Sequence, residues 1–166
     1  MKRTIHLFPE FSNIQNIEIL RIQYDPLFKL ILPHITLVFP FESTISTQAL
    51  YEHIQWVLKD INPFLIKLHD FTGTFDQYIF LNVKKGNDQI IELHDRLYSG
   101  LLSNFRDFRF SFHPHLTIGK FRDEKMLVTA LAKMSLDRTQ FETEISKIYV
   151  TAINGLERTT EFIFNF

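Results

Sequence analysis

The stretch Pro33-His34-Ile35-Thr36-Leu37 recurs as Pro114-His115-Leu116-Thr117-Ile118. Both copies read proline, histidine, aliphatic residue, threonine, aliphatic residue, and their residue numbers differ by 81. Half of the 166-residue chain is 83 residues, so the spacing indicates that each half of the chain contributes one copy. The repeat predicts two related structural units that each present one His-x-Thr segment.

Each copy has the pattern of a β-strand with one buried face. In a strand, residues i and i+2 share a face and lie roughly 6.5 Å apart. His34 and Thr36 therefore point to one side, while the aliphatic residues beside them point into the core. His115 and Thr117 repeat this arrangement. If an approximate two-fold axis relates the halves, the two strands face each other across a cleft.

Two imidazoles and two threonine hydroxyls facing one cleft suit a phosphoryl centre. Imidazole titrates near pH 6.5, so one ring can accept a proton while a protonated partner donates one. The hydroxyls of Thr36 and Thr117 can hydrogen-bond the non-bridging phosphate oxygens. A strained cyclic phosphodiester attacked by water needs no metal. The pattern therefore predicts in-line opening of a phosphodiester, with no cofactor.

Two less specific interpretations compete with this one. A single histidine on a strand more often makes a structural hydrogen bond, and threonine is common in strands because it is β-branched. His113 and His115, at i and i+2, could also form a three-histidine metal site with His34. No carboxylate lies in either motif, and a metal site leaves both threonines unexplained, so no metal is expected.

Composition bounds the class of protein. Apolar residues make up 45% and charged residues 22% of the chain, as in ordinary globular proteins. We therefore expect one domain over residues 1–166. A formal net charge of -1 disfavours duplex DNA as a partner and leaves small anionic substrates and RNA ends open. The chain has no cysteine, which excludes disulfides, thiolate metal sites and a thiol nucleophile.

Localisation and assembly follow from further absences in the sequence. No apolar run approaches the length needed to span a membrane, so no membrane partner is expected. The apolar part of residues 1–10 is too short for a signal peptide, which favours a cytoplasmic protein. Because two internal halves already complete one cleft, we expect a monomer.

Hydrophobic periodicity predicts the α+β class. Helices are expected over 11–20, 47–61, 90–101 and 123–134, where apolar residues recur every three or four positions. Strands are expected over 4–8, 35–39, 64–68, 78–83, 116–121, 145–153 and 160–166. Several strands are consecutive in the chain, which indicates a mostly antiparallel sheet.

The paired tetrads resemble the H-x-T-x motifs of the 2H phosphoesterase superfamily, which includes 2′-5′ RNA ligase-like proteins and cyclic nucleotide phosphodiesterases. Residues 73–75 and the following run 78–83 also resemble the turn and strand that these proteins place between their motifs. Tyr24-Asp25-Pro26, together with the chain length, is most similar to short phosphoesterase-like proteins of Gram-positive bacteria. The resemblance covers nearly the whole chain.

The resemblance implies a bilobal fold, with two pseudo-symmetric halves of sheet and flanking helices around a central cleft. It implies metal-independent hydrolysis of 2′,3′-cyclic or related phosphodiesters, from a small molecule or an RNA terminus. By position, His34 is then the proton donor to the leaving oxygen and His115 the acceptor that activates water. Thr36 and Thr117 are the phosphate-binding residues. The donor and acceptor roles can exchange with the polarity of the substrate.

Lys120 departs from the family, because many members have arginine shortly after the second motif. In a regular strand this lysine points away from His115, so only a bulge or bend near Gly119 would bring it to the phosphate. Lys120 is therefore left outside the predicted site.

Two other activities stay open. A non-catalytic RNA- or nucleotide-binding module could use basic residues to steer an anion, and an RNA ligase could run the same chemistry in reverse. The near-neutral charge argues mildly against the ligase. Of the remaining histidines, His94 and His53 are expected to be packing residues, and His6 and His69 have no identifiable partner in the sequence.

Overall fold

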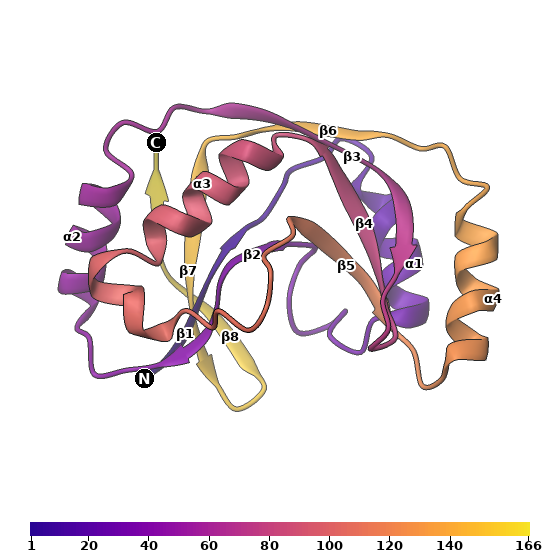
Figure 1. The fold of residues 1–166 in the computed structure, drawn as a ribbon, viewed down its shortest axis with the longest axis horizontal. Coiled ribbons are helices and arrows are strands. Elements are labelled where there is room, and N and C mark those ends of the chain that lie inside the picture. The colour runs from indigo at the N-terminus through magenta and orange to yellow at the C-terminus, as the bar shows by residue number, and fades with distance from the viewer.

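The computed structural model describes all 166 residues and forms two four-stranded antiparallel sheets (Figure 1). Sheet A has the strand order β2-β1-β7-β8 and sheet B the order β5-β4-β3-β6. The strands are β1 (Lys2–Leu7), β2 (Ile35–Glu42), β3 (Phe64–Gly73), β4 (Tyr78–Lys85), β5 (His115–Lys120), β6 (Phe141–Ile145), β7 (Lys147–Asn154) and β8 (Glu157–Asn165). The predicted α+β class with two antiparallel sheets is confirmed.

Helices flank both sheets. They are α1 (Ile14–Tyr24), α2 (Thr47–Val57), α3 (Asn87–Leu97) and α4 (Glu124–Met134), with a 3-10 helix at Gly100–Phe105. Helices α2 and α3 contact sheet A through β8 and β2, and helices α1 and α4 contact sheet B through β5 and β3 (Figure 1). None of these helices combines the length and the apolar composition that a membrane-spanning helix requires.

The two sheets do not correspond to the two halves of the sequence. Sheet A joins the first two strands to the last two, whereas sheet B is built from the middle of the chain. The helix that precedes each motif strand is also not on that strand's own sheet: α1 precedes β2 but packs on β5, and α3 precedes β5 but packs on β2. Each sheet nevertheless carries one motif strand, as the repeat predicts.

Local sequence signals set the helix starts. Ser46 accepts a hydrogen bond from the backbone amide of Ala49, and Asp123 accepts one from Met126, so both side chains cap a helix N-terminus. The helix expected over 90–101 ends at Leu97, and the chain continues as a 3-10 helix from Gly100, whose φ of +48° favours glycine.

The largest difference from the expected elements lies near residue 145. The single strand expected over 145–153 spans the end of β6 and most of β7, because the chain passes from sheet B to sheet A at Ser146. Residues 141–144 of β6 were not predicted as a strand. The alternation of buried and exposed side chains in β6 covers only five residues, too short a pattern to identify alone.

Candidate active site

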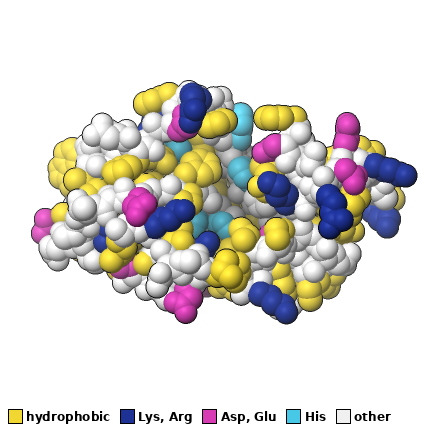
Figure 2. All heavy atoms as spheres, turned by 90° about the horizontal axis from the view of Figure 1, so that it is seen from below, with side chains coloured by type: hydrophobic (Ala, Val, Ile, Leu, Met, Phe, Trp, Pro, Cys, Tyr) yellow, Lys and Arg dark blue, Asp and Glu magenta, His cyan; other side chains and the backbone are white.

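The two motifs lie on strands that contact each other where the sheets meet. β2 is the edge strand of sheet A and β5 is the edge strand of sheet B (Figure 1). His34 lies directly before β2, and His115 is the first residue of β5. In Figure 2, histidine side chains lie in the hollow in the middle of one face of the molecule.

Both motifs show the predicted alternation. His34, Thr36, His115 and Thr117 are partly exposed, whereas the aliphatic residues between and after them are buried. Histidine and threonine of each motif therefore share the face of their sheet that is turned away from the buried core. The structure brings all four predicted site residues to two touching strands, with His34 directly before β2 and the other three within β2 and β5.

The two catalytic candidates are held in the same way. The Nδ1 atom of His34 lies 2.8 Å from the carbonyl oxygen of Leu32, and the Nδ1 atom of His115 lies 2.6 Å from that of His113. A carbonyl can only accept, so each Nδ1 carries the hydrogen. Neither Nε2 atom has a hydrogen-bond partner in the protein. Each neutral ring thus offers a free, unprotonated Nε2.

Burial shifts the pKa of both rings downward. It lowers the pKa of His34 to about 4, and the nearby Arg21 and His115 act in the same direction. The pKa of His115 is also lowered, mainly by burial. A charge on His115 lowers the pKa of His34, so protonation of the His115 ring opposes protonation of the His34 ring.

His6 on β1 is a neighbour that the sequence did not reveal. Its ring is buried, 4.5 Å from the His34 ring between centroids, and lies opposite Thr36 in the β1–β2 register. The Thr4 hydroxyl donates to the Val38 carbonyl, so its oxygen accepts from His6 Nε2 at 3.0 Å.

This arrangement leaves His6 Nδ1 buried without a partner. Burial and His34 lower the pKa of His6 to about 2, so the ring stays neutral. No partner of His6 could be identified from the sequence, and the structure places Thr4 and His34 beside it. The strand pairing that brings it beside His34 is a long-range property that a single sequence does not show.

Phe80 on β4 takes the matching place in sheet B. It lies opposite Thr117 in the β4–β5 register, as His6 lies opposite Thr36. The Phe80 ring stacks on the His115 ring with centroids 3.6 Å apart and planes 18° from parallel. The flat contact covers one side of the imidazole and contributes to its burial.

A buried arginine holds the segment that leads into His34. Arg21 is 1% exposed, and its guanidinium donates to the Asp25 carboxylate at 2.8 Å and to the Ile31 carbonyl at 2.7 Å. Asp25 also accepts from the backbone amide of Leu27. The segment Tyr24-Asp25-Pro26, noted in the sequence, therefore serves to tie the loop before β2 to helix α1.

A bulge in β5 turns Lys120 toward the same face as the motif. Ile79 pairs with Gly119, but Phe80 pairs with Thr117, so Ile118 is an extra residue in its strand. Lys120 Nζ then lies 2.9 Å from the Tyr78 hydroxyl, beside Phe80. The bulge near Gly119 that Lys120 needs in order to face the motif side is therefore present, and Lys120 lies on the same face of β5 as Thr117.

The remaining histidines separate into packing and surface residues. His94 is buried, hydrogen-bonds the Leu37 carbonyl and stacks on Phe112 at 3.8 Å, which confirms a packing role. His53 hydrogen-bonds a backbone carbonyl. His113 is exposed, and no three His, Asp or Glu side chains in the chain are placed to hold one metal ion. The alternative three-histidine site is therefore not assembled.

Comparisons with known proteins agree with this architecture. A family model described as the 2′-5′ RNA ligase superfamily matches residues 8–156. A protein of Geobacillus thermodenitrificans named "Putative phosphoesterase" is 30% identical over 158 residues, which cover 90% of this chain and 87% of that protein. A similarly named protein of Bacillus licheniformis is 31% identical over 124 residues, 72% of this chain and 71% of that protein.

Solved structures share the fold at low sequence identity. Escherichia coli LigT complexed with 3′-AMP superposes with a TM-score of 0.63 at 12% identity, covering 99% of this chain and 97% of LigT. A protein of Thermus thermophilus superposes with a TM-score of 0.64 at 13% identity, with the same coverage. Together with the match over 8–156, the two sheets and their paired His-x-Thr strands place the chain in the 2′-5′ RNA ligase superfamily of 2H phosphoesterases.

Proposed function

We propose that this chain is a metal-independent phosphoesterase that opens 2′,3′-cyclic or related phosphodiesters by acid and base catalysis. The observation that carries the proposal is the matched pair of imidazoles. On two touching strands, each ring has Nδ1 bound to a carbonyl two residues earlier and Nε2 free. The relatives named phosphoesterases and the LigT complex with 3′-AMP support a nucleotide phosphoester as substrate.

In this mechanism His115 accepts a proton from water, which attacks the phosphorus, and His34 donates a proton to the leaving oxygen. The neutral form favoured by burial suits His115 as a base at neutral pH. His34 has a pKa of about 4 in the free protein, so its proton must be retained through the negative charge of the bound phosphate. Each group contributes roughly 10²–10⁴-fold to the rate.

The two threonines hold the phosphorus between the rings. Thr36 and Thr117 share a face with His34 and His115, and their hydroxyls can donate to the non-bridging oxygens. Lys120 adds a positive charge on the same face of β5. These groups stabilise the charge that develops on the phosphoryl oxygens as water attacks.

Hydrolysis of a 2′,3′-cyclic nucleotide by the purified chain tests the proposal. We expect turnover that resists a chelator and falls by about 10²-fold or more in both His34→Ala and His115→Ala. His53→Ala is a matched control, because that histidine also hydrogen-bonds a carbonyl but lies away from the motifs. The product isomer identifies the leaving oxygen.

The other outcomes select the alternatives. Binding of the cyclic nucleotide without turnover would identify a binding module. Joining of a cyclic phosphate end to a 5′-hydroxyl RNA would identify a ligase. Loss of turnover with the chelator would replace the two-histidine mechanism by a metal-dependent one.

A further inference from the structure

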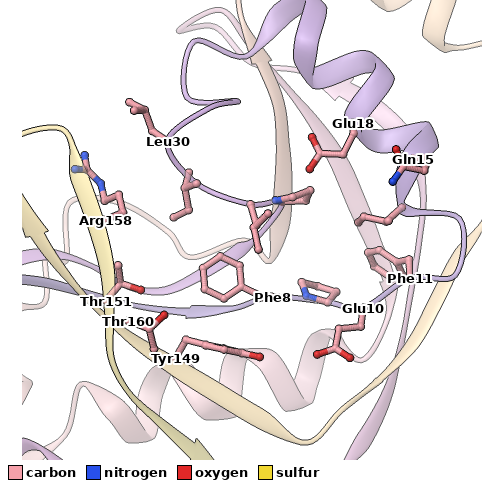
Figure 3. Close-up of a pocket in the computed structure, with 15 residues that line it drawn as sticks. Phe8, Glu10, Phe11, Gln15, Glu18, Leu30, Tyr149, Thr151, Arg158 and Thr160 are labelled. Atoms are coloured by element: carbon pink, nitrogen blue, oxygen red, sulfur yellow. The ribbon is translucent and has the colours of Figure 1, made fainter.

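A second concave site lies next to His34, on the same face of sheet A. This pocket, with a volume of about 610 Å³, is formed by the end of β1, the start of α1, the loop before β2, and strands β7 and β8 (Figure 3). Pro33, which directly precedes His34, lines it, but neither motif histidine does. Phe8 connects the two places, because its ring lies 6.0 Å from His34 and 4.9 Å from Tyr149.

The chemistry of the pocket changes from one end to the other. Arg158, Thr151 and Thr160 lie at the β7–β8 end, the rings of Phe8 and Tyr149 in the middle, and polar side chains of α1 at the far end (Figure 3). The cation and the hydroxyls suit a phosphate, and the aromatic rings suit a sugar with its base. The polar acceptors at the far end suit the hydrogen-bonding edge of that base.

Arg158 has hydrogen-bonding capacity to spare. Its Nη1 donates to the backbone carbonyls of Gly155 and Glu157, and the side chain forms no ion pair. Its charge reaches the motif, since Arg158 contributes to the lowered pKa of His6, whose ring contacts His34. The guanidinium therefore keeps Nε and Nη2 for an anion bound in this pocket.

A second observation indicates that the pocket receives a polar ligand. Thr151 is 3% exposed, lines the pocket, and its hydroxyl has no hydrogen-bond partner. A buried hydroxyl without a partner is costly unless a ligand or water satisfies it. Thr160, its partner in the β7–β8 register, places another hydroxyl on the same wall.

The far end carries acceptors for a base. Glu18 extends from α1 into the pocket. Its carboxylate makes a weak contact with Arg21, whose nearest nitrogen lies 3.4 Å away, at the edge of hydrogen-bond distance. One carboxylate oxygen can accept from an amino or ring N–H of a nucleobase. Glu10, also at the rim, is paired with Lys147 at 2.7 Å.

We propose that this pocket binds the nucleoside attached to the cyclic phosphate and that Arg158 binds the 5′-phosphate of the same nucleotide. The inference rests on the proposed function and narrows its substrate class. The preferred substrates are 2′,3′-cyclic phosphates that carry a phosphate at the 5′ position, either a free nucleotide or the 3′ end of an RNA. Nucleoside cyclic phosphates with a 5′-hydroxyl lack the group that Arg158 recognises.

Three substrates test the proposal: adenosine 2′,3′-cyclic phosphate, its 5′-phosphorylated form, and the dinucleotide ApA with a 2′,3′-cyclic end. We expect kcat/KM to be about 10-fold or more higher for a substrate with a 5′-phosphate, because a charge-assisted hydrogen bond is gained. A preference for the dinucleotide would identify RNA ends as the source of that phosphate. A preference for the monoester would identify a free nucleotide.

Arg158→Ala is the decisive variant. It should lower kcat/KM for the 5′-phosphorylated substrates at least 10-fold more than for the 5′-hydroxyl substrate, and Arg158→Lys should restore part of the difference. Arg138→Ala is the matched control, since Arg138 is an exposed arginine that also donates only to a backbone carbonyl. The proposal is overturned if the wild type has the same kcat/KM for substrates with and without a 5′-phosphate. It is also overturned if Arg158→Ala keeps the wild-type preference for the 5′-phosphate.

Binding separates this proposal from the proposed function. Calorimetry with adenosine 3′,5′-bisphosphate and with 3′-AMP needs no turnover. A chain that hydrolyses nothing but binds the bisphosphate about 10-fold more tightly, with loss of that difference in Arg158→Ala, retains the pocket and refutes the catalytic assignment. Equal affinity for the two ligands refutes the pocket assignment whether or not the chain is active.

Discussion

The two motif strands carry the same residues in the same order, but the strands beside them differ. In sheet A, His34 contacts a buried histidine, His6, whereas in sheet B the matching neighbour of His115 is Phe80. Both rings use Nδ1 in the same way, yet the pKa of His34 is lowered to about 4, with Arg21 and His115 adding to the effect of burial. The motif positions the imidazole, and its burial together with charged groups from α1 and the other motif sets how readily His34 takes a proton.

The loops that lead into the two histidines differ as well. The loop before β2 is tied down by the buried Arg21, while the loop before β5 has exposed aromatic side chains, Phe108 and Phe110. Its Arg109–Asp107 pair is a local contact at the surface. We infer that the His34 side is the more rigidly held half of the site.

The largest effect on stability is expected from breaking the buried ion pair of the first loop. Arg21→Met leaves the Asp25 carboxylate and the Ile31 carbonyl without their donor, which should cost about 3–5 kcal/mol of unfolding free energy. Arg109→Met removes the exposed pair of the other loop and should leave the urea midpoint unchanged. Equal urea midpoints for the two variants would show that the two side chains contribute equally to stability, and would contradict the inferred difference between the loops.

The contact between α1 and β5 can be tested at Gly119, which corresponds in the motif to Val38 of β2. A Cβ atom on Gly119 would lie 2.4 Å from the Tyr24 Cβ and 2.7 Å from the Tyr24 carbonyl oxygen. Gly119→Ala must push the end of α1 away and should cost about 1–3 kcal/mol in urea unfolding. A variant as stable as the wild type would contradict this close approach.

Making the neighbours of the two motifs alike tests the role of His6. The unfolded chain takes up a proton on this histidine near pH 6.5, but the folded pKa is about 2, so stability is full above pH 6.5 and is lost as the pH falls. His6→Phe should reduce the decrease in unfolding free energy between pH 6.5 and pH 4 by about 1–3 kcal/mol. Urea unfolding at several pH values measures it, and parallel pH curves would refute the assignment.

The smallest effect is expected from the stacked ring of sheet B. Phe80→Leu removes the flat contact on His115 and admits water, so the pKa of His115 should rise toward its ordinary value. The pKa of His34 should not rise, because its own neighbours remain and a charge on His115 opposes its protonation. Titration of the two imidazoles by NMR checks this. A change in the pKa of His34 alone would contradict the assignment of Phe80 as the ring that covers His115.

Much of the fold could be predicted from local patterns. The helix starts at Ser46 and Asp123 follow from capping chemistry, and the alternation in the motifs correctly predicts which side chains are buried. The prediction failed where the pattern was short, as in β6, and where the α-helix gave way to a 3-10 helix, as between Leu97 and Gly100. Local hydrophobic periodicity also does not show that the chain passes from one sheet to the other at Ser146.

The sequence by itself determined the chemistry of the candidate site, because His34, Thr36, His115 and Thr117 are recognisable from their repeat and their two-residue spacing. Only the tertiary structure decided what surrounds them. The ring contact of His6 with His34, the bulge that turns Lys120, and the pocket at Arg158 join segments that are far apart in the chain. Strand register and close packing create these neighbours, and both depend on how the whole chain minimises exposed apolar surface and unpaired backbone groups.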